Sequence, residues 1–326
     1  MKKFIVFVVI TALVFAGCSA PNESTKSDAG DSLKIVCTVF PQYDWVRQIL
    51  GDRVGDIELT LLQRSLADLH NYQPSVDDMI TISACDLFIY VGGESDHWAD
   101  AALRQAVNPD MIVLNLLETL GDAAKIEELF EGMQDDDDHD EDDHDDEDEF
   151  DEHVWLSLRN AEIFCAAIAE ILSSLDADYA EQYNANLTDY RAALSFLDAA
   201  YKEAVDAAPV DTLLFGDRYP FRYLMDDYGL KAYAAFPGCS AETEASFQTM
   251  TFLVEKLDEL NLNHVMVTEG SNQSIAKTII SNSNDPNRGI LVLDSMQSVT
   301  SGGAASGAAY LAIMGSNLNV LKEALQ

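Results

Sequence analysis

Four side chains suited to binding a divalent metal ion follow segments that are expected to form β-strands. His70 and His153 are imidazoles in the first half of the chain, and Asp217 and Asp294 are carboxylates in the second half. In open α/β sheets, ligands bind beyond the carboxyl ends of the strands, where all four are expected to lie. Imidazole and carboxylate together suit divalent metals. The set predicts one metal ion that holds the two halves together and neutralises carboxylates that would otherwise repel.

Each of these residues also has a purely structural explanation. His70 could cap the helix after it, and His153 could pack beside Trp155. Asp217 could pair with a neighbouring arginine, and Asp294 could cap a turn. Taken singly, each residue fits the structural explanation better, whereas the four together at strand ends favour a metal site.

Other residues are weaker candidates. Glu94 and Glu269 also follow predicted strands, where each could instead accept hydrogen bonds from backbone N–H groups at a helix start. His97 either lines the site or packs beside Trp98, and the glycine-rich segment 302–307 is expected to be a flexible loop. The chain has no CxxC, HExxH or GxSxG signature, which argues against a thiolate zinc site and against a hydrolase.

Apolar runs that alternate with helical patterns must position these side chains. They predict an α/β fold with two similar lobes, each a four-stranded, mainly parallel sheet flanked by helices. Strands are expected at 34–40, 57–62, 87–91 and 111–115, and then at 212–215, 231–236, 264–268 and 290–293. Helices are expected near 43–50, 75–83, 98–106, 221–227, 245–260 and 274–281.

The stretch 160–208 contains no glycine, and its apolar residues recur at helical spacing. It predicts a long, rigid helical connection between the lobes. The predicted domains are an N-terminal lobe at 33–157, a connecting helix at 158–176 and a C-terminal lobe at 177–326.

The N-terminus is similar to a lipoprotein export signal. Lys2 and Lys3 precede an apolar run that is too short to span a bilayer comfortably. The run closes with VFAGC, which resembles the lipobox of bacterial lipoproteins. Residues 1–17 are therefore the predicted signal peptide, Cys18 the lipidated N-terminus and 18–32 a polar tether. A plain secretory signal with an incidental cysteine is the alternative.

Acidic residues dominate the 326-residue chain. Lys and Arg total 19 against 57 Asp and Glu, and a formal net charge of -38 argues against binding to nucleic acid or anionic lipid. In the segment 135–152, fifteen of 18 residues are acidic and two, His139 and His144, are histidines. Self-repulsion should keep this loop extended. It is either a solvated loop without a specific role or an auxiliary site that captures cations weakly.

The four cysteines after Cys18 leave pairing open. Cys37 and Cys85 lie in apolar, strand-like surroundings and are expected to be small buried side chains rather than metal ligands. Nothing in the spacing of Cys165 and Cys239 decides their redox state.

Two motifs resemble one protein family. Residues 68–75 (DLHNYQPS) are similar to the first-histidine motif, and residues 152–156 (EHVWL) to the second, of the zinc/manganese-type solute-binding lipoproteins of bacterial ABC importers, family 9. The resemblance covers almost the whole mature chain. It implies two lobes joined by a rigid helix, a buried divalent ion between them and delivery to a membrane permease. An acidic, histidine-bearing loop before the second histidine is typical of zinc members.

One position departs from the family pattern. Many zinc members have a histidine just after the first strand of the second lobe, where this chain has FGDRYP at 215–220. Manganese-type relatives place a carboxylate there, so Asp217 is the expected substitute, with Glu242 and Glu244 as alternatives. Asp294 matches the family's last ligand. Oxygen ligands favour manganese, whereas two imidazoles in tetrahedral geometry favour zinc, which also binds more tightly. Zinc is the predicted metal, with manganese as the alternative.

The predicted function is that of a monomeric, lipid-anchored, extracytoplasmic protein that captures zinc between its lobes and delivers it to an ABC permease, without catalysis. One alternative is a manganese-binding protein of the same type. Less favoured are an adhesin or scaffold with a structural metal, and a metallohydrolase, which needs a metal-bound water and a general base.

Overall fold

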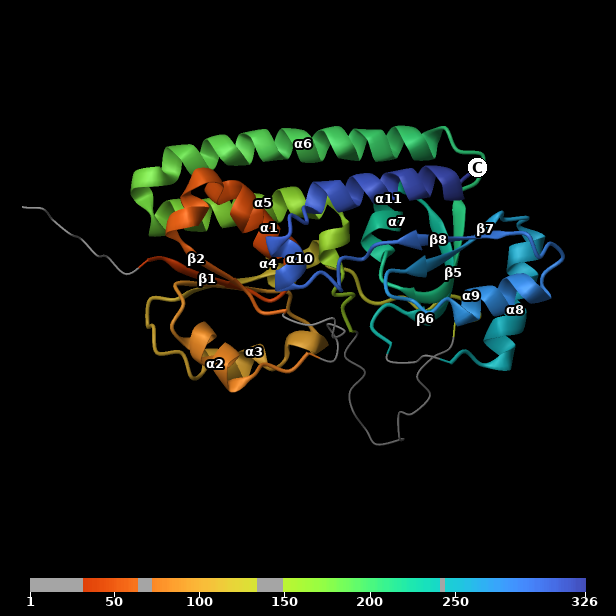
Figure 1. Ribbon diagram of the computed structural model, residues 1–326, viewed down its shortest axis with the longest axis horizontal. Helices are drawn as coiled ribbons and strands as arrows, with labels where there is room; N and C mark the ends of the chain where they lie inside the picture. The colour runs from red at the N-terminus through yellow and green to blue at the C-terminus, as the bar shows by residue number, and fades with distance from the viewer. Residues whose placement is uncertain (1–31, 64–71, 134–148, 241–243) are drawn as a thin grey trace, which may run out of the picture. The chain divides into compact units, whose positions relative to one another are not determined.

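Two parallel sheets form the framework of the protein. The computed structural model describes residues 32–63, 72–133, 149–240 and 244–326 (Figure 1). One sheet contains β1 (Lys34–Cys37), β2 (Glu58–Leu61), β3 (Leu87–Tyr90) and β4 (Ile112–Asn115), and the other contains β5 (Thr212–Tyr219), β6 (Lys231–Pro237), β7 (His264–Thr268) and β8 (Gly289–Leu293). Their strand orders, β2-β1-β3-β4 and β6-β5-β7-β8, are equivalent. The predicted α/β fold with two similar halves is therefore confirmed.

Helices connect the strands in each half. The first half contains α1 (Phe40–Leu50), α2 (Val76–Ser83), α3 (Ala99–Leu103) and α4 (Leu116–Leu120), and the second contains α7 (Arg222–Tyr228), α8 (Phe247–Glu259), α9 (Ser274–Asn282), α10 (Ser301–Ala305) and α11 (Tyr310–Ala324). The glycine-free stretch between them forms α5 (Leu158–Leu175) and α6 (Ala180–Asp206), separated by a 3-10 turn at Ala177–Tyr179. Helix α6 packs on α5 and also on α1 and α11, so it contacts both halves (Figure 1).

One hydrophobic core is shared by both halves. Alternate residues of a strand point to opposite faces of its sheet, so Ile35 of β1 enters the shared core and Val36 enters a smaller cluster beside α2 and α3. In the shared core, Trp45 of α1 packs against Phe164 of α5 and Tyr310 of α11, with ring centroids 5.5 and 5.3 Å apart. A third cluster lies between the second sheet and helices α8 and α9.

Strand β5 is longer than its sequence pattern predicts. The predicted strand ends at Phe215, but pairing with β6 resumes after a bulge and continues through Tyr219. A bulge inserts an extra residue and redirects the side chains beside it. Asp217 consequently lies inside a strand rather than in the loop after it.

Two further segments differ from the sequence-based expectation. Helix α1 begins at Phe40, three residues before the predicted start. Pro41 fits the first turn of this helix, because the N–H group that proline lacks would have no partner within the helix at that position. The segment 302–307, expected as a flexible loop, lies partly in the short helix α10, where the Thr300 side chain accepts a hydrogen bond from the Gly303 N–H.

The cysteines of the described residues all have free thiols. Cys37 and Cys85 are buried, as predicted, and so is Cys165, whereas Cys239 is partly exposed. In these same ranges, no helix combines the length and the apolar character needed to cross a bilayer. The predicted signal peptide and Cys18 lie outside the described residues.

Candidate metal centre

Three of the four predicted metal ligands lie in described parts of the chain. His153 is fully buried and precedes the 3-10 turn Val154–Leu156. Asp217 lies in β5, and Asp294 directly follows β8. Outside the described residues lie His70 and the auxiliary candidates His139 and His144.

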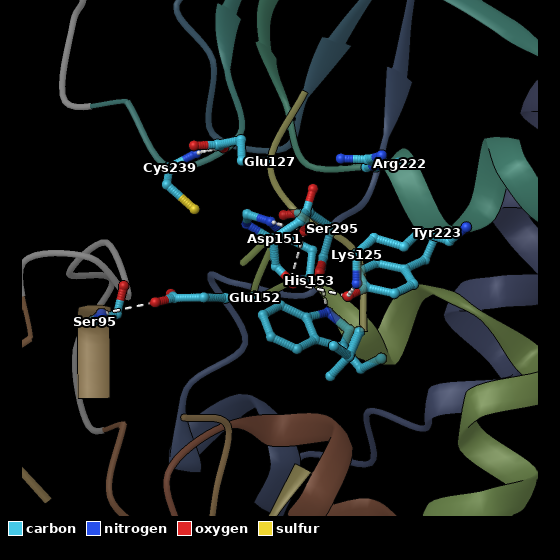
Figure 2. A network of polar contacts seen from close by, with 12 residues as sticks. Ser95, Lys125, Glu127, Asp151, Glu152, His153, Arg222, Tyr223, Cys239 and Ser295 are labelled. Atoms are coloured by element: carbon cyan, nitrogen blue, oxygen red, sulfur yellow. Dashed lines mark hydrogen bonds and ion pairs between the residues drawn. The ribbon is translucent and has the colours of Figure 1, made fainter. Parts of the chain in front are cut away.

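Asp151 orients the imidazole of His153. One oxygen of this buried carboxylate, Oδ1, lies 2.8 Å from the backbone nitrogen of His153 and 3.0 Å from its Nδ1 atom (Figure 2). Because an ionised carboxylate only accepts hydrogen bonds, Nδ1 carries the proton in this arrangement and Nε2 is the ring atom suited to a metal. The ring also meets Trp155 edge-on, with centroids 5.4 Å apart.

Opposing effects set the pKa of His153. Burial alone would lower it, whereas the Asp151 carboxylate and its hydrogen bond, together with the nearby Glu152 and Glu127, raise it, and the net shift is upward. A metal ion at this imidazole competes with a proton. Metal affinity is therefore expected to fall as the pH falls.

Glu152 connects the histidine segment to the first sheet. Its Oε1 atom accepts a hydrogen bond of 2.7 Å from the Ser95 backbone N–H, in the loop after β3 (Figure 2). Gly93 makes room for this contact, because a Cβ atom there would lie 2.4 Å from the same oxygen. Burial raises the pKa of Glu152 to about 7, although Ser95 and His153 oppose the shift. A cation nearby would favour the ionised carboxylate.

A short antiparallel ladder precedes His153, and Tyr223 ties this ladder to the second half. Its strands are residues 125–127 and 149–151, with backbone hydrogen bonds of 2.7 and 2.8 Å. The Tyr223 hydroxyl, from α7, accepts a hydrogen bond from the Lys125 N–H at 2.9 Å and donates one to the Asp151 carbonyl at 3.1 Å. The segment that carries the imidazole is thus bonded to both halves of the protein.

The end of β6 also contacts His153. Gly238 packs so closely on the imidazole that a Cβ atom there would lie 3.0 Å from Cε1 and 3.2 Å from Nδ1. The next residue, Cys239, donates its backbone N–H to Glu127 at 3.0 Å. Burial raises the pKa of Glu127, although this hydrogen bond opposes the shift. A thiol and several carboxylates therefore surround the buried imidazole (Figure 2).

The carboxylate of Asp217 is bonded within the second sheet. Its Oδ2 atom accepts hydrogen bonds from the backbone N–H and the hydroxyl of Thr268, at 3.1 and 2.8 Å, and Oδ1 accepts one from the Arg218 N–H at 2.9 Å. These bonds join β5 to the end of β7. The two strands lie where the strand order reverses, which is the usual ligand position in open α/β sheets.

Asp294 lies beside a second carboxylate, Glu269. Burial and the charge of Glu269 raise the pKa of Asp294 to about 6. Glu269 itself accepts hydrogen bonds from three backbone N–H groups of the loop after β8, so it has the anchoring role that was its structural alternative. The Trp155 indole donates a hydrogen bond of 2.8 Å to the Ser295 carbonyl, which brings the His153 turn beside the Asp294 loop.

The predicted ligands are thus only partly assembled. The segments of His153 and Asp294 are hydrogen-bonded neighbours, whereas Asp217 is bonded to β7. Within the ranges that the structure describes, no three His, Cys, Asp or Glu side chains are grouped so that they could hold a metal ion. The four-ligand site stays a prediction, because His70 lies outside those ranges.

The weaker candidates lie in different surroundings. Glu94 and His97 are mostly exposed, with side-chain exposures of 80% and 64%. Glu244 is exposed as well, and Glu242 lies outside the described residues.

Sequence reasoning missed three residues around His153. Asp151 precedes the histidine by two positions, and this spacing was a usable signal for a carboxylate that can reach the ring. Cys239 follows the carboxyl end of β6, the same signal that singled out Asp294. Glu127 gave no signal of its own, because its hydrogen-bond partner lies 112 positions away in sequence.

Comparisons with known proteins agree with this architecture. A family model described as "Zinc-uptake complex component A periplasmic" matches residues 35–324. The high-affinity zinc uptake system protein ZnuA of Bacillus subtilis (strain 168) is 29% identical over 328 residues, which cover 99% of this chain and 98% of the relative. The zinc-binding lipoprotein AdcA of Streptococcus pneumoniae is 28% identical over 327 residues, and the match covers 99% of this chain but 61% of that longer relative.

Solved structures show the same fold. The metal-dependent lipoprotein YcdH from Bacillus subtilis superposes with a TM-score of 0.71 at 25% identity, and the match covers 90% of this chain and 99% of that chain. The Zn(II)-bound ZnuA-like domain of Streptococcus pneumoniae AdcA superposes with a TM-score of 0.68 at 26% identity, with coverages of 90% and 99%. Since the family model spans both sheets and the helices between them, this chain belongs to the family of periplasmic components of zinc-uptake complexes.

Proposed function

We propose that this protein is the extracytoplasmic zinc-binding component of an ABC importer, which captures zinc between its two halves and delivers it to the permease. The family match and the zinc-uptake names of its relatives support zinc as the cargo. One structural neighbour at 26% identity is described as Zn(II)-bound. Binding and release are the whole function, so no catalytic activity is proposed.

The buried, oriented imidazole of His153 carries this proposal. Zinc-bound histidines usually donate their second ring N–H to a carboxylate or carbonyl, as His153 donates to Asp151. The ring lies between the Gly238 backbone of the second half and the segment that Glu152 ties to the first half. An ion bound at this imidazole would therefore touch the junction of the two halves.

We propose His70, His153, Asp217 and Asp294 as the zinc ligands. Burial and the charge of Glu269 raise the pKa of Asp294 and so disfavour its ionised form, and a bound cation would favour that form. A carboxylate has about four lone-pair sites, so Asp217 can accept its present hydrogen bonds and still bind a metal. Two imidazoles favour zinc over manganese.

We further propose that Cys18 is lipidated and anchors a monomeric mature protein to the membrane. Replacing Cys18 with alanine is expected to move the protein from the membrane fraction to the soluble fraction. Retention of the Cys18→Ala variant in the membrane fraction would contradict the anchor.

Calorimetric titration of the metal-stripped protein with zinc and with manganese, at fixed pH, tests the function. Zinc is expected to bind more tightly, and His153→Ala to lower zinc affinity by more than about tenfold, since even partners of metal-bound histidines contribute about that much. Circular dichroism should show the metal-free variant folded. His97→Ala, at an exposed site, is the matched control and should bind normally. Unchanged tight binding by His153→Ala would refute the site, and a preference for manganese would replace zinc as the cargo.

A further inference from the structure

Cys239 lies directly beside the proposed zinc ligand His153. The close packing of Gly238 on the imidazole brings the end of β6 against the ring, because residue 238 has no side chain to hold the two apart. The backbone N–H of Cys239 is fixed by Glu127 at 3.0 Å. The position of Cys239 is therefore set by the same segment, 125–127, that pairs with the chain leading to His153.

The thiol of Cys239 is directed toward that chain. Figure 2 shows the side chain turned toward the Asp151–His153 segment. The three other cysteines of the described residues are fully buried, whereas Cys239 is partly exposed. Among the cysteines that the structure describes, Cys239 is thus the one that is partly exposed and adjoins the glycine packed on the histidine.

The second half otherwise offers mainly oxygen ligands to the metal. Asp217, which stands near the position of the missing third imidazole, already accepts three hydrogen bonds from Thr268 and Arg218. A thiolate is a softer ligand than a carboxylate, and thiolates favour zinc, whereas oxygen ligands suit manganese. A sulfur ligand just after β6 would favour zinc over manganese, which the carboxylate of Asp217 does not.

We propose that the Cys239 thiolate binds the same zinc ion as His153 and makes the site select zinc over manganese. This inference rests on the proposed function and adds one ligand to it. On binding, a zinc–sulfur bond forms and the thiol proton passes to solvent. Both metal and sulfur keep their oxidation states.

Cobalt(II) is the probe for this ligand, because a cobalt–thiolate bond gives an intense near-ultraviolet charge-transfer band that oxygen and nitrogen ligands lack. The metal-stripped full chain is titrated with cobalt as the wild type, as Cys239→Ser and as the control Cys85→Ala, whose thiol is buried in a core cluster. The band is expected in the wild type and the control and should disappear in Cys239→Ser, while the visible cobalt bands persist.

Zinc and manganese affinities provide the second measurement. Cys239→Ser is expected to lower zinc affinity by at least about tenfold and to change manganese affinity much less, so that the preference for zinc narrows. Alkylation of wild-type Cys239 by iodoacetamide, followed by peptide mass spectrometry, should slow when zinc is present, which tests the contact without any variant.

Two failures are distinguishable. Cobalt binding with visible bands but no charge-transfer band, or alkylation that zinc does not slow, would overturn the role of Cys239 and leave the proposed function intact. Absence of any zinc or cobalt binding to the wild type would overturn the proposed function itself.

Discussion

Asp151 is expected to control zinc affinity at His153 without touching the metal. Its Oδ1 atom holds both the backbone and the ring of the histidine, at 2.8 and 3.0 Å. Asp151→Ala frees the ring to rotate and removes the charge that favours a basic Nε2, and such losses typically cost about 10- to 100-fold in metal affinity. Calorimetric zinc titration measures the effect.

Asp52→Ala provides the matched control, since Asp52 is an exposed carboxylate on a turn of the first half. It removes the same charge from the protein without contacting the site. Equal losses of affinity in the two variants would mean that Asp151 acts through general charge rather than through the orientation of His153.

The sequence could identify residues that belong to a local motif, and much less of what surrounds them. His153 stands out in EHVWL because the motif is contiguous. The contact between Trp155 and Ser295 joins residues 140 positions apart, and no local pattern encodes it. The bonds of Asp217 to Thr268 depend on the bulge in β5, which arises from pairing with a different strand. Predicting these neighbours requires the tertiary fold.

Asp96 is expected to make the stability of the protein depend on pH. This buried carboxylate accepts hydrogen bonds from the Val91 and Gly92 N–H groups, yet burial raises its pKa from 3.8 to about 6. The folded state therefore holds a proton that the unfolded state loses near pH 4, so stability falls as the pH rises from about 4 to about 6. Asp96→Asn keeps an accepting oxygen, and should remove this pH dependence and stabilise the protein at pH 7 by at most about 3 kcal/mol.

Urea unfolding of the metal-free protein between pH 4 and 7 measures this contribution. The exposed Asp110, replaced in the same way, controls for the loss of one negative charge. If Asp96→Asn unfolds with the same pH slope as Asp110→Asn, then burial of Asp96 does not set the slope.

At the scale of elements, the start of α5 is fixed by Ser157. Its hydroxyl accepts a hydrogen bond from the Asn160 N–H at 3.0 Å and donates one to Asp227 of α7 at 2.6 Å. Ser157→Ala removes a helix cap, worth about 1 kcal/mol, and deprives a half-buried carboxylate of a donor. The free energy of unfolding is expected to fall by about 2 kcal/mol, as measured by denaturant titration.

Ser174 near the end of α5 offers the comparison. It is exposed, and its hydroxyl bonds to the Ile171 carbonyl of its own helix, so Ser174→Ala should change stability by less than about 0.5 kcal/mol. A loss in Ser157→Ala no larger than this would mean that the cap and its bond to α7 contribute little.

Element positions were largely predictable because buried parallel strands read as short apolar runs. Strands β1 and β7 and helix α9 begin at the predicted residues. The failures have local physical causes. The extra length of β5 comes from renewed pairing with β6, and α10 forms although its sequence is rich in glycine, because Thr300 caps its first turn. Glycine content alone therefore overstated the flexibility of that segment.

At the scale of the whole molecule, polar contacts reinforce the shared core. The buried Asp44 of α1 accepts a hydrogen bond from the Tyr310 N–H of α11 at 2.8 Å, and Arg47 reaches the Ala308 carbonyl at 2.9 Å. The Tyr310 hydroxyl donates to the Trp155 carbonyl at 2.6 Å, next to the His153 turn. Separating the halves as rigid bodies would break all of these contacts. Zinc exchange is therefore expected to proceed by rearrangement of loops around His153.

The acidic segment is expected to speed zinc capture more than it strengthens final binding. Replacing residues 135–148 with a short Gly–Ser linker keeps the Glu149 carbonyl that bonds the Glu127 N–H, so the ladder before His153 is preserved. The change removes twelve acidic residues and shifts the formal net charge from -38 to -26. Because a concentrated negative field raises the encounter rate with cations by about tenfold or more, the association rate should fall while affinity at the principal site changes little.

Stopped-flow zinc binding at low and high salt, with equilibrium titration for weak sites, separates charge from ligation in this segment. At about 1 M salt the Debye length is near 3 Å, so the rate difference between the wild type and the deletion should nearly vanish.

A variant with His139 and His144 both changed to serine keeps the carboxylates, so it should capture zinc at the wild-type rate but lose weakly bound zinc. If this serine variant binds zinc as slowly as the deletion, the imidazoles rather than the carboxylates would be responsible for fast capture. A deletion with unchanged rate and unchanged weak binding would leave the segment as a solvated loop without a role in uptake.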